Sequence, residues 1–521
     1  MSDGFIADLE RALGREHVVT DRAECEFYAQ DVYRRGEIPA AVIRPGTVEE
    51  LSAALRLVAP TGAPIVPRGG GMSYTDGYLP ARAGSITVDL LRLNRIETVQ
   101  ADDGYVTVEC GATWKALHAA VAPRGMRTPY WGPLSGLRST IGGALSQGSM
   151  FLGSGRYGAV AESVIGLDVV LVDGTVLRLG AHANRNGAPF FRQVGPDVLG
   201  MFLSDTGALG IKAKASFRLI RLPPATRHAS FAFDTHASLF AAMQAVARDE
   251  LASECFAFDP GLQAQRLKRA SLAEDTKVLG KVVQAAGGAL AGLKAGARLV
   301  MAGRGFLEGI KFSLHMSLDG RDAADVEAKA AAAKRLASAA GGREIESSVP
   351  TVMRANPFAE VTSMLGPAGE RWVPVHGIVP FTQAPAMFEA CEAVFGSHAE
   401  PMQRFGIEAG YLLCTVGAAG TLIEPMLYWP DARQLFHERV LPAEHLAKLP
   451  RHAENLPARQ AVARIRDELA QAFLEAGAVS FQLGKYYRYQ ESLDASAAGF
   501  LRQLKRLVDP EGRMNPGSLG L

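Results

Sequence analysis

Several patterns that define large enzyme classes are missing from the sequence. The glycine-rich stretch at residues 66–77 has Tyr74 at the sixth position, where a GxGxxG dinucleotide motif requires glycine. No GxxxxGK motif followed by Ser or Thr occurs, and neither does a GxSxG or an HExxH pattern. These absences argue against a nicotinamide-binding Rossmann domain, a P-loop nucleotidase, an α/β-hydrolase and a zinc peptidase.

Paired cysteines, unbalanced charge and long apolar runs are also missing. The five cysteines lie far apart and form no CxxC pair, which argues against a disulfide framework and a zinc knuckle. A net charge of +1 gives no electrostatic reason to expect nucleic acid as a partner. The most apolar stretch, residues 285–303, is interrupted by Lys294 and Arg298, unlike a membrane-spanning helix. Acids interrupt residues 1–18, where a signal peptide needs an apolar core, so we expect a cytoplasmic protein.

What the sequence does contain is a globular composition with alternating elements. Its 521 residues, 48% of them hydrophobic, suggest two or more domains. Short β runs and helical runs alternate up to Pro223 and Pro224, which indicates an α+β or α/β unit. Beyond these prolines, further β runs are separated by helical stretches, which favours one antiparallel sheet with helices on one face. These β runs are residues 229–233, 309–318, 373–379 and 411–416, and a last one follows at 479–483.

Residues 261–311 form a basic stretch, with nine Lys or Arg against three acids. One interpretation is a solvated insertion on a domain surface. The other is a peripheral contact with an anionic membrane or partner.

Glycine-rich and hydroxyl-rich loops recur along the first half of the chain. Three consecutive glycines at 69–71 follow a predicted strand at 64–67. Such glycines permit positive φ and leave N–H groups exposed, which suits a pyrophosphate, although a tight turn would explain this loop by itself. Similar small residues recur at 139–145, 153–158 and 204–211. Several such loops favour a large, elongated cofactor held along its length.

The order of these segments resembles the flavoproteins of the vanillyl-alcohol oxidase / p-cresol methylhydroxylase (PCMH-type) superfamily. The resemblance covers about residues 38–521 and rests on PRGGGMSYTDG, STIGGALSQGS, SGRYG with ESVIGLDVVLVDGTVLRLG, SDTGALGI and VDPEGRMNPGSLG. It implies an α+β fold with a two-subdomain FAD-binding domain at residues 1–223 and 476–521. A cap domain with an antiparallel sheet flanked by helices would occupy residues 224–475.

The resemblance also implies FAD as the cofactor and assigns the loops to it. Residues 67–74 would cradle the pyrophosphate, and residues 164–165 would lie near the adenine. The complete set of predicted cofactor-binding residues is Pro67, Arg68, Gly69, Gly70, Gly71, Met72, Ser73, Tyr74, Pro133, Ser139, Thr140, Gly142, Gly143, Gly153, Arg156, Tyr157, Gly158, Val164, Ile165, Gly207, Ile211 and Asn515.

Two departures from the family concern the attachment of the flavin. Many relatives carry a histidine in the glycine loop that bonds covalently to the flavin, whereas this loop offers Met72 and Tyr74. Other relatives use a histidine on a cap strand, and the matching residues 416–426 contain none. We therefore expect FAD to be held without a covalent bond, with a tyrosine such as Tyr428 as the alternative attachment.

The resemblance also suggests residues for substrate binding and catalysis. Tyr487 and Arg488 match a tyrosine and an arginine that bind the phenolate in phenol-oxidising relatives. A cation and a hydroxyl donor suit a phenolate or a carboxylate, while a contact with FAD or a structural ion pair would account equally for Arg488. The candidates for the catalytic base are His376, Tyr487 and Lys485, although a lone histidine in a strand is often structural.

Two motifs of relatives are absent. Phenol-oxidising members place an aspartate near the flavin, but residues 130–161 contain no acid and offer Ser135 instead. The metal motif of 2-hydroxyacid members is not reproduced at residues 375–378, so we expect no metal.

Together these features predict an FAD-dependent oxidase or dehydrogenase. It would take a hydride from a hydroxyl-bearing small molecule, such as a phenolic alcohol or a 2-hydroxy acid. The alternatives are a redox-neutral flavoenzyme of the alkyl-dihydroxyacetonephosphate synthase type and a flavin-containing protein that docks on a membrane. The electron acceptor and the formation of a homodimer are left open.

Overall fold

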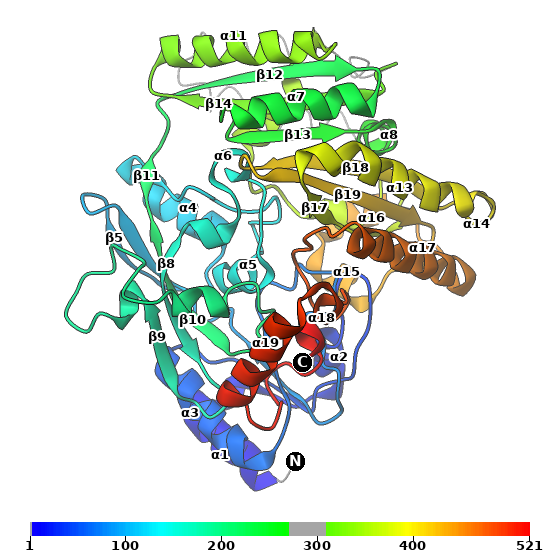
Figure 1. Ribbon diagram of the computed structural model, residues 1–521. Coiled ribbons are helices and arrows are strands. Elements are labelled where there is room, and N and C mark those ends of the chain that lie inside the picture. Colours follow the sequence, from blue (N-terminus) through cyan, green and yellow to red (C-terminus); the bar gives the residue numbers. More distant parts are fainter. Residues whose placement is uncertain (1–2, 270–308) are drawn as a thin grey trace.

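The computed structural model describes residues 3–269 and 309–521, which form four β-sheets with helices around them (Figure 1). Most of the basic stretch predicted at 261–311 lies outside the described residues. Within the described ranges, no helix combines the length and the apolar character needed to cross a bilayer.

A four-stranded sheet is built from the N-terminal part of the chain. Its strands run in the order β1 (Val18–Val19), β2 (Ala41–Ile43), β4 (Ile86–Asp89) and β3 (Ile65–Arg68), and β2 and β3 are parallel to β4. Helix α3 (Val48–Val58) begins after Thr47, because the Thr47 side chain accepts the Glu50 N–H. Helix α1 (Asp3–Leu13) packs beside it. The glycine loop follows directly on β3.

The second sheet is antiparallel and carries the other glycine-containing loops. Its order is β5 (Ile96–Gln100), β6 (Tyr105–Glu109), β10 (Ile211–Arg218), β8 (Val164–Val170) and β9 (Val176–Gly180). Asp173 and Gly174 lie in the hairpin turn between β8 and β9. Helices α4 (Trp114–Val121) and α5 (Ile141–Gln147) pack on this sheet around a core that includes Trp114 and Phe217. A short pair, β7 (Met126–Arg127) and β11 (Ile220–Arg221), lies beside it.

The largest sheet has eight strands and confirms the predicted antiparallel sheet flanked by helices. Its strands are β15 (Arg343–Ile345), β12 (Ala225–Phe233), β14 (Phe312–Gly320), β13 (Glu254–Phe258), β18 (Glu408–Val416), β19 (Gly420–Trp429) and β16 (Arg371–Pro374), with β17 (Gly377–Val379) also paired to β19. Figure 1 shows α7 (His236–Arg248), α11 (Ala323–Ala339), α13 (Ala384–Ser397) and α17 (Leu456–Glu475) along this sheet. The domain boundaries at 223 and 475 stay predictions.

Side-chain alternation gives the eight-stranded sheet two different faces. On β19, Ile423, Leu427 and Trp429 join the core beneath the helices. Leu422 and Met426 point the other way and form a separate cluster. This second face is not covered by α7, α11, α13 and α17, and it forms a wall of the cavity described below.

A buried ion network ties α12 (Ser348–Ala355) to this sheet. Arg354 contacts Glu254 Oε2 at 2.6 Å and also pairs with Asp319. Arg127, from β7, contacts Asp319 at 2.8 Å. Burial opposes the ionised carboxylate, but Arg354 and Arg127 outweigh it and lower the pKa of Asp319 to about 2. The network thereby links the N-terminal part of the chain to the eight-stranded sheet.

Two predicted strands differ from the structure. The predicted run at 373–379 is broken between β16 and β17, because the His376 N–H donates to the Tyr487 hydroxyl (2.9 Å) instead of a neighbouring strand. The predicted strand at 479–483 is wrong, since Val479 makes one isolated bridge with Ile378 and Gln482 has a φ of 48°. The chain also forms helices α6 (Ser154–Tyr157), α8 (Pro260–Arg269), α18 (Tyr489–Ser492) and α19 (Ala495–Val508).

Candidate cofactor and substrate site

A cavity of about 1050 Å³ lies between the glycine loops and the second face of the eight-stranded sheet. This volume is slightly above the roughly 300–1,000 Å³ that small-molecule pockets occupy. Most of the predicted cofactor residues line the cavity: Pro67, Arg68, Gly69, Gly70, Gly71, Met72, Ser73, Tyr74, Pro133, Ser139, Thr140, Gly142, Gly143, Gly207 and Ile211. The structure therefore brings together loop residues that are up to 144 positions apart in the sequence, from Pro67 to Ile211.

The glycine loop packs directly against backbone. A Cβ on Gly70 would lie 1.9 Å from the Arg138 carbonyl oxygen, and one on Gly69 would lie 2.3 Å from Thr140 Oγ1. Gly71 has a φ of 70°, which L side chains rarely adopt. These positions explain why side chains are excluded from residues 69–71.

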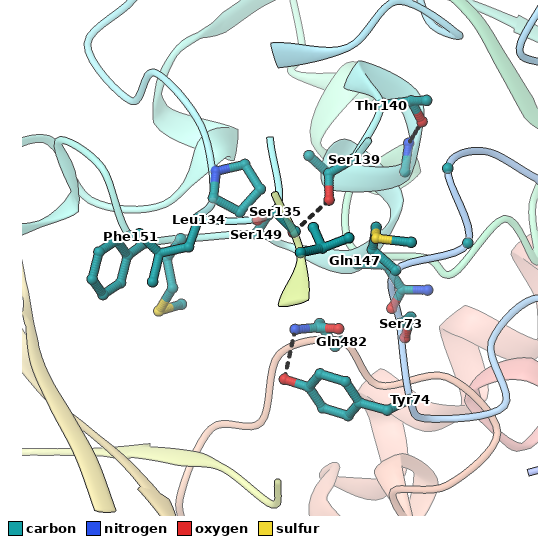
Figure 2. Close-up of a pocket in the computed structure, with 18 of the residues that line it drawn as sticks. Ser73, Tyr74, Leu134, Ser135, Ser139, Thr140, Gln147, Ser149, Phe151 and Gln482 are labelled. Atoms are coloured by element: carbon teal, nitrogen blue, oxygen red, sulfur yellow. Dashed lines mark hydrogen bonds between the residues drawn. The ribbon is translucent and has the colours of Figure 1, made fainter. Parts of the chain in front are cut away.

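The loop before α5 packs against the glycine loop and continues the same wall. Thr140 Oγ1 accepts the Gly143 N–H at 3.2 Å and so starts the helix, and the Ser135 and Ser139 hydroxyls lie 2.6 Å apart. Figure 2 shows Ser139 and Thr140 on one side of the pocket and Tyr74 with Gln482 on the other. A Cβ on Gly142 would lie 2.9 Å from Cys110 Cβ, so this turn also depends on glycine.

Arg68 contributes to the cavity wall, but its charge is engaged elsewhere. Its guanidinium lies over the rings of Phe27, Tyr28 and Tyr78, at 4.7, 4.9 and 4.9 Å from their centroids. It also donates to the Phe27 carbonyl at 3.3 Å. The role of Arg68 in the structure is thus to hold the loop by cation–π contacts.

Asn515 lies behind the loops rather than in the cavity wall. Its Nδ2 donates to the carbonyls of Gly77 and Thr206, both at 2.7 Å. Its Oδ1 accepts from Lys485 Nζ at 2.8 Å. Lys485, a predicted catalytic residue, also donates to the Leu79 carbonyl at 2.6 Å, and burial lowers its pKa to about 8. The two side chains therefore join the glycine loop to the loop at 204–211.

Six other predicted cofactor residues are also absent from the cavity wall. The segment that contains Gly153, Arg156, Tyr157 and Gly158 contacts the eight-stranded sheet, where the Gly153 N–H donates to Glu254 Oε1 at 2.9 Å. A Cβ on Gly153 would lie 2.2 Å from the Pro129 carbonyl oxygen, so this glycine serves a close packing contact. Val164 and Ile165 are buried in β8.

The sheet side of the cavity contains a polar group that sequence reasoning missed. Glu424, on β19, lines the cavity and accepts a hydrogen bond from the Tyr74 hydroxyl at 3.1 Å. Gln482 Nε2 in turn donates to the Tyr74 oxygen at 3.0 Å, as Figure 2 shows. Burial raises the pKa of Glu424 to about 7, and the bond from Tyr74 opposes that rise.

A signal for Glu424 is present in the sequence. The run GTLIEPMLYW places one carboxylate in an otherwise apolar strand. Period-two alternation puts Leu422, Glu424, Met426 and Tyr428 on one face, and all four line the cavity.

Two other predicted catalytic residues form a layer behind this wall. The His376 ring stacks on Phe481, which lines the cavity, with centroids 4.0 Å apart. The Tyr487 hydroxyl accepts the His376 backbone N–H at 2.9 Å and lies 3.2 Å from His376 Nδ1. Burial lowers the pKa of His376 to about 3, so its imidazole is neutral near pH 7. Both residues support the wall without lining it.

Arg488 lies away from the cavity. Its side chain is about half exposed and contacts Glu491 at 3.3 Å, at the start of α18. The structure therefore gives Arg488 the surface ion pair that was the alternative to substrate binding.

The residues of the cavity fit FAD. The glycines at 69–71, 142–143 and 207 line the cavity with backbone, as an elongated, phosphate-bearing ligand requires. Among the described residues that line the cavity there is no histidine and no cysteine. Elsewhere in the described ranges, no group of His, Cys, Asp or Glu side chains is placed to hold a metal ion.

Comparison with known proteins defines the class. Residues 39–180 match the family model of an FAD binding domain. A crystal structure of p-cresol methylhydroxylase with substrate bound has a TM-score of 0.74 at 16% identity, over 100% of this chain and 98% of that one. The chain is therefore an FAD-binding protein with the PCMH-type fold, and FAD is its cofactor.

Two curated proteins with named activities are similar in sequence to part of this chain. D-2-hydroxyglutarate dehydrogenase of Xanthomonas citri is 32% identical over 254 residues, 48% of this chain and 52% of that protein. The mitochondrial D-lactate dehydrogenase (cytochrome) 1 of Saccharomyces cerevisiae is 28% identical over 242 residues, 45% of this chain and 40% of that protein. The chain thus spans about half the length of these relatives.

Proposed function

We propose that this chain is an FAD-dependent oxidoreductase that takes a hydride from a carbon bearing a hydroxyl group. The observation that carries the proposal is a cavity in which glycine-rich loops face the hydrogen-bonded group of Tyr74, Glu424 and Gln482. The relatives named as dehydrogenases of D-lactate and D-2-hydroxyglutarate support hydroxyl-bearing substrates. Phenolic alcohols and 2-hydroxy acids are the two classes that the family suggests.

The glycine loops form the part of the site that holds the cofactor. In this proposal, residues 67–74, 139–143 and 207–211 bind FAD without a covalent bond. FAD, when bound, supplies the two-electron acceptor for the hydride.

Glu424 is the group placed to receive the proton of the substrate hydroxyl. Its carboxylate faces the cavity, and its pKa of about 7 suits proton transfer near neutral pH. Tyr74 orients this carboxylate by donating to Oε1, and Gln482 fixes Tyr74 by donating to its oxygen. His376, with a pKa of about 3, is a much weaker base and keeps the wall in place by stacking on Phe481.

Anaerobic bleaching of the flavin tests the proposal. The purified chain loaded with FAD is mixed with phenolic alcohols, simple alcohols and 2-hydroxy acids, and absorbance near 450 nm is followed. At least one class should bleach the flavin, with a rate constant that rises with pH through about 7 as Glu424 loses its proton. Turnover that leaves the flavin oxidised and needs no electron acceptor would instead identify a redox-neutral enzyme.

A further inference from the structure

The sheet side of the cavity has a large apolar surface beside the group around Glu424, and the polar residues Gln265, Ser348, Asn356, Glu360 and Ser363 also line the cavity. Helix α8 contributes Leu262, and α12 contributes Val349, Val352 and Met353. Strands β18 and β19 add Leu412, Leu422, Met426 and Tyr428. Several of these residues belong to one hydrophobic cluster, which leaves a continuous apolar surface for a ligand.

The cationic side chains of the cavity wall are already engaged. In the described part of the chain these are Arg68 and Lys212. Arg68 is 3% exposed and lies among three aromatic rings. Lys212 forms a buried ion pair with Asp205. Neither is free to neutralise an anionic substrate.

The lack of a free cation among the described lining residues matters because Glu424 is itself negatively charged when it is ionised. Once Glu424 is ionised, above a pH of about 7, a carboxylate substrate whose hydroxyl reaches it would place a second negative charge in the same space without a cation beside it. Burial of an unpaired charge next to a like charge is strongly unfavourable. A neutral alcohol carries no such penalty, because its hydroxyl hydrogen-bonds Glu424 while its apolar body contacts Met353, Leu412 and Leu422.

We infer that Glu424 is a specificity-determining residue that selects an uncharged, largely apolar alcohol over a 2-hydroxy acid. This inference rests on the proposed function and narrows its substrate class. It separates this chain from the named activities of its relatives, which are matched over less than half of its length.

A matched pair of ligands tests the inference. Mandelate carries a carboxylate where 1-phenylethanol carries a methyl group, and both enantiomers of each are used. Ligand binding is followed by perturbation of the flavin spectrum, and reduction by anaerobic bleaching. We expect the wild-type holoprotein to bind 1-phenylethanol about 100-fold more tightly than mandelate, the scale set by an unpaired buried charge.

Variants at Glu424 and at Met353 test whether charge in the cavity causes the difference in binding between mandelate and 1-phenylethanol. Glu424→Gln keeps a hydrogen-bond acceptor for Tyr74 and removes the charge, so mandelate binding should improve about 10-fold while 1-phenylethanol binding changes little. Met353→Lys adds a cation to the α12 wall, and it should improve mandelate binding relative to the uncharged variant Met353→Gln. Equal effects of the Lys and Gln variants would contradict the electrostatic reasoning.

The outcomes separate the inference from the function on which it rests. Bleaching by mandelate but not by 1-phenylethanol, or tighter binding of mandelate, overturns the inference and keeps the proposed function. Tighter binding of 1-phenylethylamine than of the alcohol also overturns it, because Glu424 would then be the counter-ion of a cationic substrate. If no hydroxyl compound bleaches the flavin, the proposed function itself fails.

Discussion

Glu424 makes the stability of this protein depend on pH in a direction that can be calculated. Burial raises its pKa from 4.5 to about 7, so the folded state binds this proton more tightly than the unfolded state. Its contribution favours folding at low pH and is lost as the pH rises from about 4.5 to above 7. The full shift corresponds to about 3 kcal/mol, and roughly 2.5 kcal/mol of it is lost between pH 5 and pH 8.5.

Glu424→Gln removes this titration and keeps an acceptor for the Tyr74 hydroxyl. The free energy of unfolding of the wild type should therefore fall between pH 5 and pH 8.5 by about 2.5 kcal/mol more than that of the variant. Urea unfolding at each pH measures the free energy of unfolding. The transitions followed by tryptophan fluorescence and by circular dichroism must coincide, as two-state unfolding requires. Glu360→Gln is the control, because it removes an exposed carboxylate from the same cavity wall.

Parallel pH profiles of the wild type and Glu424→Gln would refute this reasoning. They would mean that Glu424 ionises in the folded state as easily as in the unfolded chain. Both its role as a proton acceptor near neutral pH and its burial in an apolar wall would then be wrong.

Four further predictions address the cofactor loops and the packing. Gly70→Ala should abolish FAD binding, because its Cβ would lie 1.9 Å from a carbonyl oxygen, whereas Gly499→Ala, with open space around it, should retain full flavin absorbance. Arg354→Ala should lower the free energy of unfolding by about 3–5 kcal/mol, since it leaves two buried carboxylates without this cation. Arg488→Ala should leave flavin bleaching by substrate within about twofold, because its partner is a surface carboxylate. Acid precipitation should leave the flavin in the supernatant, and a yellow pellet would show a covalent bond.

The cofactor side of the cavity could be predicted because its determinants are local. Consecutive glycines, a threonine that caps a helix and a left-handed turn are each visible within a few residues of sequence. Residues 67–74 and residues 139, 140, 142 and 143 line the same cavity, and their contact with FAD stays a prediction. Asn515 was assigned to the same neighbourhood, but its hydrogen bonds run to the backbone of two loops, a detail that no local pattern contains.

The substrate side could not be predicted in the same way, because it depends on pairing between distant strands. Glu424 lies beside Tyr74 only after β19 pairs with β18 and the glycine loop packs on that sheet. Tyr487 and His376 are predicted catalytic residues, and in the structure they lie one layer behind the cavity wall. Sequence position relative to a family motif does not specify the side to which a side chain points.

The hydrogen bonds of Asn515 also set the order of events during synthesis. Asn515 joins Gly77 to Thr206, and Gly77 precedes it by 438 residues. At the roughly 5–20 residues per second of translation, that interval lasts on the order of 20 to 90 seconds. The glycine loop therefore leaves the ribosome well before Asn515, the residue that fixes it, has been synthesised. We therefore expect FAD to bind late during synthesis. When FAD is scarce, the nascent chain would still have a glycine loop that no hydrogen bond from Asn515 fixes.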